Sequence, residues 1–199
     1  MTHKVHNTII VIVALMVCIS CSLSPEDDAL KRLEETIREK DKYNNELLDR
    51  CDGLRSRLYM CSDDSVKWDL AEELFSEYYS YDIDSAFTYA NILANLADTP
   101  EKKLTAISRK ASCMCALRMY GTVEDMLSEI DTVGFTPTQY KTYYNAHITL
   151  FTALGNEFST VEAKAKSNIR KRYEYQELLS SLPNLTVKER LYIRGKQLM

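Results

Sequence analysis

Helix-forming segments joined by short turns follow one another through the second half of this chain, and this pattern limits the folds it can adopt. Within each segment, apolar residues recur at steps of three and four, which places them on one face of a helix. Residues that start helices stand at the boundaries, as in Asp82-Ile83-Asp84-Ser85 and Thr136-Pro137-Thr138-Gln139. A pair of amphipathic helices cannot bury its own apolar face, so we predict three stacked helical hairpins over residues 66–182.

The composition agrees with helix throughout, because only five Gly and four Pro occur in 199 residues. Ala86, Met126 and Ala163 stand at corresponding places in the second helix of each pair, and so indicate a repeat of about 40 residues. The second unit resembles the tetratricopeptide (TPR) pattern, with a break predicted at Gly121-Thr122. We therefore predict an all-α chain, in which a long N-terminal helix precedes TPR-like antiparallel helical hairpins in an α-solenoid.

Residues 29–60 carry a heptad pattern that predicts the long helix. Its stripe contains Leu30, Leu33, Ile37, Leu47, Cys51, Leu54 and Leu58. Lys40 and Asn44 fill the two remaining stripe positions. The stripe could pair with a second copy, in which Asn44 would set the register, or it could pack against the helices that follow. The sequence leaves both alternatives open.

The N-terminus has the pattern of an export signal. Lys4 precedes an apolar run from Ile9 to Ile19 that is too short to span a bilayer, so residues 1–20 are predicted to be a signal peptide. The segment Cys18-Ile19-Ser20-Cys21 resembles the lipobox of bacterial lipoproteins, which makes Cys21 the predicted lipidation site. Residues 21–28 would form an acidic tether. We expect a lipid-anchored protein of the cell envelope that faces the periplasm or the cell surface. The alternatives are a cleaved signal without lipid and an uncleaved anchor.

The sequence offers no catalytic site, metal site or cofactor motif. His3 and His6 lie in the predicted signal peptide, which leaves His147 alone and excludes a His-based triad or a HExxH zinc site. The formal net charge of −4 becomes one unit more negative without Lys4, so we expect no nucleic-acid partner.

Four cysteines follow Cys21, and we expect them to be buried free thiols. Cys113 and Cys115 are predicted to face opposite sides of a helix, which suits neither a disulfide nor a metal site. A bridge between Cys51 and Cys61 is the alternative for an oxidising compartment.

Two further groups of residues are candidate binding surfaces. The chain holds 13 tyrosines, and Tyr79 and Tyr144 each neighbour a tyrosine on a predicted core face, so they are candidates for a partner-binding groove. The alternative is that the tyrosines fill packing positions. The candidate basic patch on the helix of the third hairpin consists of Lys164, Lys166, Arg170, Lys171 and Arg172.

Several segments resemble the N-terminal region of an uncharacterised Bacteroidota family of TPR-like envelope proteins and regulators. They are Leu33-Glu34-Glu35-Thr36-Ile37, Tyr78-Tyr79-Ser80-Tyr81, Met119-Tyr120-Gly121 and Tyr140-Lys141-Thr142-Tyr143-Tyr144. The resemblance implies a TPR-like envelope domain that, in the family, precedes a transmembrane helix and usually a DNA-binding domain. It transfers no catalytic residue. Residues 186–199 are predicted to form one more helix, which is either a terminal cap or the start of a unit whose second helix is missing.

These observations lead to one functional expectation and one alternative. We expect a non-enzymatic, lipid-anchored interaction module that binds a protein or peptide in an envelope sensing, regulatory or assembly complex. The alternative is a glycan-binding or small-ligand-binding lipoprotein of nutrient uptake.

Overall fold

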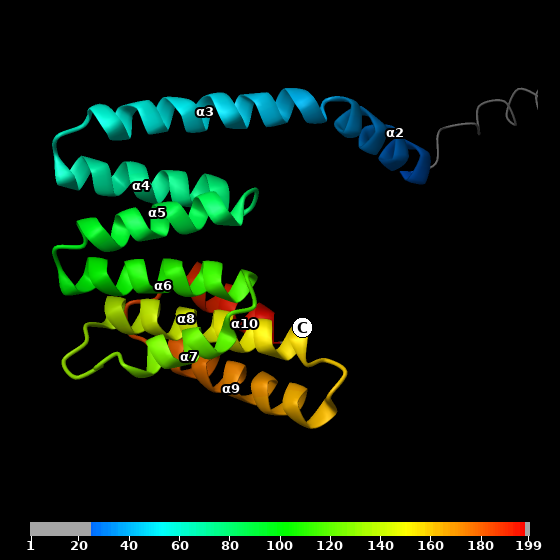
Figure 1. The fold of residues 1–199 in the computed structure, drawn as a ribbon. Coiled ribbons are helices and arrows are strands. Elements are labelled where there is room, and N and C mark those ends of the chain that lie inside the picture. The colour runs from blue at the N-terminus through cyan, green and yellow to red at the C-terminus, as the bar shows by residue number, and fades with distance from the viewer. Residues whose placement is uncertain (1–24, 198–199) are drawn as a thin grey trace, which may run out of the picture. The chain divides into compact units, whose positions relative to one another are not determined.

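The computed structural model describes residues 25–197, and the secondary structure of this part of the chain is entirely helical (Figure 1). This confirms the predicted all-α class. The predicted signal peptide and Cys21 lie outside the described residues. The helices are α2 (Pro25–Arg38), α3 (Lys40–Met60), α4 (Asp64–Tyr79), α5 (Ile83–Leu96), α6 (Pro100–Ala116), α7 (Tyr120–Ser128), α8 (Pro137–Glu157), α9 (Glu162–Ser180) and α10 (Val187–Gln197).

The chain divides into two compact units after Asp49, and the first unit contains α2 and the beginning of α3. The prediction of one continuous helix over residues 29–60 is wrong at Glu39, which forms a turn between α2 and α3. The apolar stripe is interrupted at the same place, because Lys40 and Asn44 occupy its positions there. The stripe residues of α2 are more than half exposed: Leu30 59%, Leu33 55% and Ile37 62%.

The second unit begins with the rest of α3. Cys51 and Leu54 are buried, and Arg50 forms an ion pair with Glu77 of α4 at 2.8 Å. Of the two alternatives for the heptad stripe, packing against the following helices therefore holds for this half of α3.

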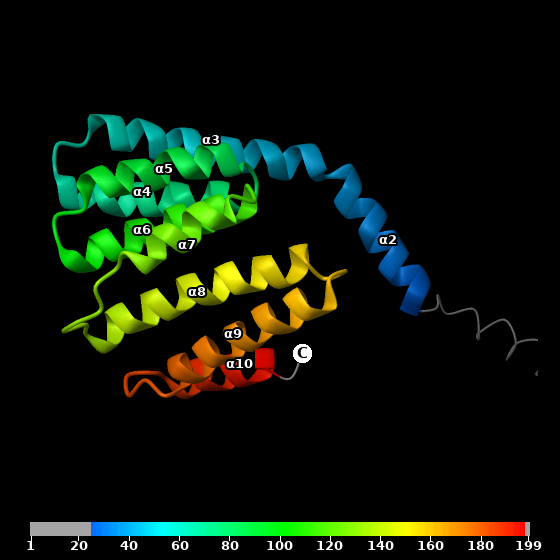
Figure 2. The same ribbon diagram turned by 60° about the horizontal axis from the view of Figure 1, so that its bottom comes forward.

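Helix pairs α4–α5, α6–α7 and α8–α9 then follow in order, and α10 packs on α9 (Figures 1 and 2). Asp63 and Asp82 start α4 and α5 by accepting hydrogen bonds from N–H groups of their first turns. Thr136 and Gln139 form the predicted capping box of α8. Because α7 is short, α6 also packs directly on α8. One buried cluster joins these three helices and consists of Ala111, Cys115, Val123, Leu127, Ala146, Leu150, Phe151 and Leu154.

The turn between α6 and α7 differs from the prediction. Gly121 lies inside α7, and the chain instead turns at Arg118, whose φ is 61°. The N–H of Met119 donates to the Met114 carbonyl at 2.9 Å, and the N–H of Arg118 donates to Cys115 at 3.1 Å. These bonds close the end of α6 in the manner of a Schellman turn, a place where glycine is the usual residue. Arg118 tolerates this conformation while its guanidinium pairs with Glu157 at 3.3 Å.

The third hairpin also departs from the predicted register. Ala163 is exposed, whereas Ala165 is buried and takes the position against α8. The helix α9 begins after Val161 without a side-chain cap. The hairpins are therefore real, but their repeat positions are not in the predicted alignment.

Candidate interaction surface

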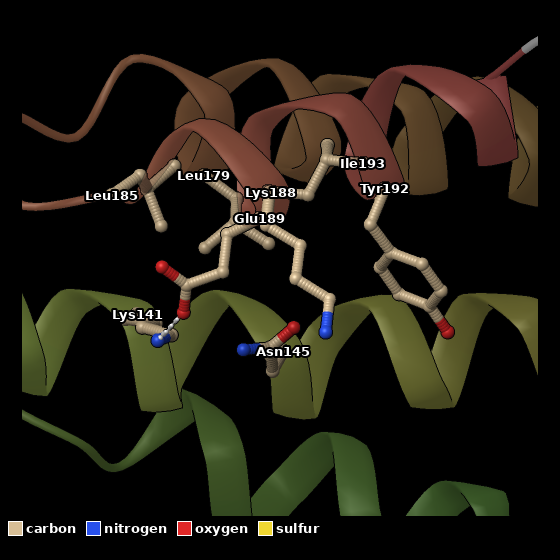
Figure 3. Close-up of a pocket in the computed structure, with 8 residues that line it drawn as sticks. All are labelled: Lys141, Asn145, Leu179, Leu185, Lys188, Glu189, Tyr192 and Ile193. Atoms are coloured by element: carbon tan, nitrogen blue, oxygen red, sulfur yellow. Dashed lines mark hydrogen bonds and ion pairs between the residues drawn. The ribbon is translucent and has the colours of Figure 1, made fainter.

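A pocket of about 480 Å³ lies between α8 and α10 (Figure 3). Its floor is apolar and is made by Leu179, Leu185 and Ile193, all of them buried. Polar and aromatic side chains surround this floor: Lys141 and Asn145 from α8, and Lys188, Glu189 and Tyr192 from α10. An apolar floor with a few polar groups at its edge is the usual composition of a ligand site.

Glu189 holds α10 in place over α8. One carboxylate oxygen accepts hydrogen bonds from the Thr186 N–H at 2.8 Å and the Thr186 hydroxyl at 2.7 Å. The other oxygen pairs with the Lys141 ammonium. Lys141 and Thr186 together lower the pKa of Glu189 to about 2. Glu189 therefore stays ionised, and it neutralises Lys141 while it caps α10.

A second, more polar pocket of about 330 Å³ shares Lys141 and Asn145 with the first. Its other lining residues are Thr105, Ser108 and Arg109 of α6 with Thr138 and Thr142 of α8. Arg109 makes two hydrogen bonds to Glu72 of α4, at 3.2 and 2.8 Å. We use the name first-helix face for the surface that holds Glu72 and the lining residues of both pockets. This surface runs across α4, α6 and α8, which are the first helices of the three hairpins, and then across α10.

Tyr79 and Tyr144 do not meet in one groove, and neither lines the two pockets of the first-helix face. Tyr79 is 38% exposed and stacks on Phe75 at 5.4 Å, and burial raises the pKa of its phenol. Tyr144 is half-buried and stacks on Tyr140 at 5.5 Å. Tyr144 also packs against the buried cluster that forms the pocket floor. Tyr144 therefore packs on the residues of the pocket floor without lining the pocket itself.

The five cations of the candidate basic patch lie on different sides of α9. Lys164 and Lys171 each hold their ammonium 4.9 Å from a phenylalanine ring, of Phe158 and Phe151 respectively. Lys166 and Arg170 lie on the side of α9 roughly opposite to Lys164 and Lys171. They pair with Glu162 and Glu174 of α9 itself. The guanidinium of Arg172 lies over the Tyr173 ring. The prediction of a single cationic face is therefore wrong, since residues two apart on a helix diverge.

The aromatic residues of α8 and α9 form a cluster around His147. The His147 ring stacks on Tyr175 at 4.3 Å, and its Nδ1 lies 3.1 Å from the Tyr143 carbonyl oxygen, which accepts the hydrogen bond. Burial raises the pKa of Tyr175 to about 12 and lowers the pKa of His147. His147 is therefore a neutral packing residue at neutral pH.

Acidification is expected to weaken the fold through His147. Its folded pKa lies below the unfolded value near 6.5, so its contribution to stability is complete above that value and is lost as the pH falls below it. Urea unfolding at pH 7.5 and 5.5 should show a larger loss of free energy for the wild type than for His147→Gln. Equal losses in both proteins would contradict this prediction. A chain that begins at Cys21 has no other histidine, so the comparison isolates this ring.

The four described cysteines are free, and three of them are buried. Burial raises the pKa of the Cys113 and Cys115 thiols to about 11 and also raises that of Cys51. Cys61 is half-buried, so its thiol is the one partly accessible thiol among these four cysteines. In this structure Cys51 and Cys61 do not form the alternative bridge.

Thiol labelling should therefore separate Cys61 from the other three. In a chain that begins at Ser22, a disulfide reagent is expected to modify one thiol rapidly at pH 8 and the rest only after unfolding, because buried thiols seldom ionise. A Cys61→Ser variant should lose the fast phase. Rapid labelling of all four thiols would contradict the structure. The absence of a fast phase in wild-type protein that has not been treated with a reductant would also contradict it, because Cys61 would then not be a free thiol.

Within residues 25–197 no group of His, Cys, Asp or Glu side chains is arranged to hold a metal ion. In the same range, none of the helices combines the length and hydrophobicity needed to cross a bilayer.

The hairpins and the polar face along their first helices are features of a helical repeat domain, and the sequence of residues 37–199 matches the model of the SusR N-terminal TPR domain. The chain belongs to this family. The match confirms the resemblance to a Bacteroidota family of TPR-like proteins and covers all helices from α3 onward. No curated protein and no solved structure matches the chain. TPR domains generally bind other proteins, so membership in the SusR N-terminal TPR domain family indicates an interaction module.

Sequence reasoning missed the polar residues of the first-helix face. Lys141 and Asn145 are one helical turn apart on α8, and Arg109 lies on α6. The sequence shows the spacing of these residues on their own helices. It does not show that α10 closes a pocket over Lys141 and Asn145. That contact joins residues 48 apart in sequence, Lys141 and Glu189.

Proposed function

We propose that this chain is a non-enzymatic, lipid-anchored protein-interaction module that works in an envelope sensing, regulatory or assembly complex. The observation that carries the proposal is the first-helix face, where two adjoining pockets with polar edges extend over α6, α8 and α10. A stack of hairpins presents such a face to segments of another protein. Membership in the SusR N-terminal TPR domain family supports the same conclusion.

The membrane attachment in this proposal depends on Cys21. The apolar run and the lipobox-like segment that ends at this cysteine support it. The acidic residues Glu26, Asp27 and Asp28 lie in the first turn of α2, so this helix begins inside the predicted tether of residues 21–28. Self-association through residues 29–60 also stays a proposal. The exposed Leu30, Leu33 and Ile37 support it.

The test is capture of the partner from the intact envelope. The tagged chain would be cross-linked in its native envelope, purified and compared with Asn145→Trp and with the matched control Ser167→Trp. Both positions are exposed on helices, so both variants should fold, but only the first places a large uncharged ring in the pockets.

The proposal expects one discrete protein with the wild type and with Ser167→Trp, and at least a tenfold lower recovery with Asn145→Trp. Equal recovery from all three chains would move the interaction away from the first-helix face. Recovery of no protein, together with oligosaccharide binding by the purified chain, would replace the proposal with a role in nutrient uptake.

A further inference from the structure

Two polar side chains face each other across the apolar floor of the pocket between α8 and α10. Figure 3 shows Lys188 extending from α10 toward α8 and ending beside Asn145. Within the described part of the chain, neither the Lys188 ammonium nor the Asn145 carboxamide has a hydrogen-bond or ion-pair partner. The pocket therefore presents unused donors in the same lining as buried Leu179, Leu185 and Ile193.

The charges around the pocket select the chemistry of its occupant. Glu189 neutralises Lys141, and Glu72 neutralises Arg109 through two hydrogen bonds. Among the described residues, Lys188 is thus the cation lining this pocket that no carboxylate balances. A carboxylate between Lys188 and Asn145 would accept hydrogen bonds from both, while an attached apolar group covers the floor. A volume of about 480 Å³ holds such a carboxylate together with one aliphatic side chain.

The second pocket extends this site in one direction. Beyond Asn145 and Lys141, it offers the hydroxyls of Thr105, Ser108 and Thr142. The Thr105 and Thr142 hydroxyls donate to the carbonyls of Glu101 and Thr138, so their oxygens can accept from N–H groups of an extended backbone. The Ser108 hydroxyl can both donate and accept. A small free acid would fill the first pocket only, whereas a peptide uses both.

We propose that the pocket between α8 and α10 binds an extended acidic and apolar peptide segment of a partner protein. A Glu or Asp carboxylate of that segment sits between Lys188 and Asn145, its neighbouring aliphatic side chain covers Leu179, Leu185 and Ile193, and its backbone continues over the second pocket. This inference rests on the proposed function, since it names the class of partner that the same face takes.

Binding of short labelled peptides to the mature chain tests the proposal. The probes are acetylated, amidated hexapeptides that place Glu or Asp beside Leu, Ile, Val or Phe between Gly and Ser residues, measured by fluorescence anisotropy at 0.15 M salt. We expect the best of them to lose about tenfold in affinity when its acid is replaced by the amide or its aliphatic residue by Gly. Lys188→Gln should lower its affinity about as much, because it removes the same ion pair. Lys166→Gln, which removes an exposed lysine on α9, should leave the affinity unchanged.

Equal affinities for the acid and amide peptides would overturn the proposal, and so would unchanged binding by Lys188→Gln. Binding of neutral oligosaccharides in place of every peptide would also overturn it, in favour of a glycan site. If the peptides fail while Asn145→Trp still abolishes capture of a protein from the envelope, the interaction module stands and only the acidic peptide is wrong.

Discussion

Replacing Phe151 with Ala is expected to lower the free energy of unfolding by about 3–5 kcal/mol. Phe151 is 6% exposed in the cluster that joins α6, α7 and α8, so the change leaves a cavity in the buried contact between the second and third hairpins. Its ring also stacks on Tyr175 of α9 at 5.8 Å and lies under the Lys171 ammonium. Truncation removes these contacts together with the apolar burial. Urea unfolding followed by circular dichroism measures the loss.

Tyr81→Ala is the matched control for this prediction. Tyr81 is 52% exposed in the turn between α4 and α5, so its removal should change the free energy of unfolding by no more than about 0.5 kcal/mol. A loss of similar size in both variants would mean that α8 does not pack between α6 and α9 as described. Conservative replacement by Leu at position 151 should restore part of the loss, because it refills the cavity.

Replacing Cys21 with Ser is expected to move nearly all of the protein from the membrane fraction to the soluble fraction. Stable attachment by acyl chains requires more than one chain, and lipidation at a single cysteine supplies all of them. Within residues 25–197, no helix is long and apolar enough to cross a membrane. Fractionation of cells grown with labelled fatty acid measures both the location of the protein and its lipid.

Cys18→Leu separates the anchor from a general effect of cysteine loss. It changes the other cysteine of the same segment to the residue that usually begins a lipobox, so the label and the membrane location should persist. Label that remains on Cys21→Ser, or that disappears only from Cys18→Leu, would show that the anchor has been assigned to the wrong residue.

The helices and their order could be predicted from the sequence because local rules determine them. Apolar periodicity gave the hairpins, and side-chain caps such as Thr136 and Asp82 marked where helices begin. The errors arose where tertiary contacts override a local rule. Arg118 takes a left-handed turn that favours glycine, so the nearby Gly121 suggested the wrong break. Ala165 rather than Ala163 is buried, because the packing of α9 on α8 decides which alanine faces the core.

The candidate site was harder to predict for the same physical reason. Tyrosine enrichment suggested a groove, but Tyr144, Tyr143 and Tyr175 mainly pack on one another around His147. A local count cannot tell an aromatic ring that binds a partner from one that fills a core. The first pocket depends instead on α10, which returns over α8 and is held there by the pair of Lys141 and Glu189. No periodicity within one helix encodes that contact.

Photo-cross-linking from single positions would test most directly whether the first-helix face binds a partner. A photoreactive amino acid at position 145, on α8, is compared with one at position 167, on α9, in the native envelope. Both positions are exposed, and position 145 alone lies in the two pockets. Our interpretation predicts a cross-link to one partner protein from position 145 and none from position 167. A cross-link from position 167 alone would contradict it, because the partner would then bind the second helices of the hairpins.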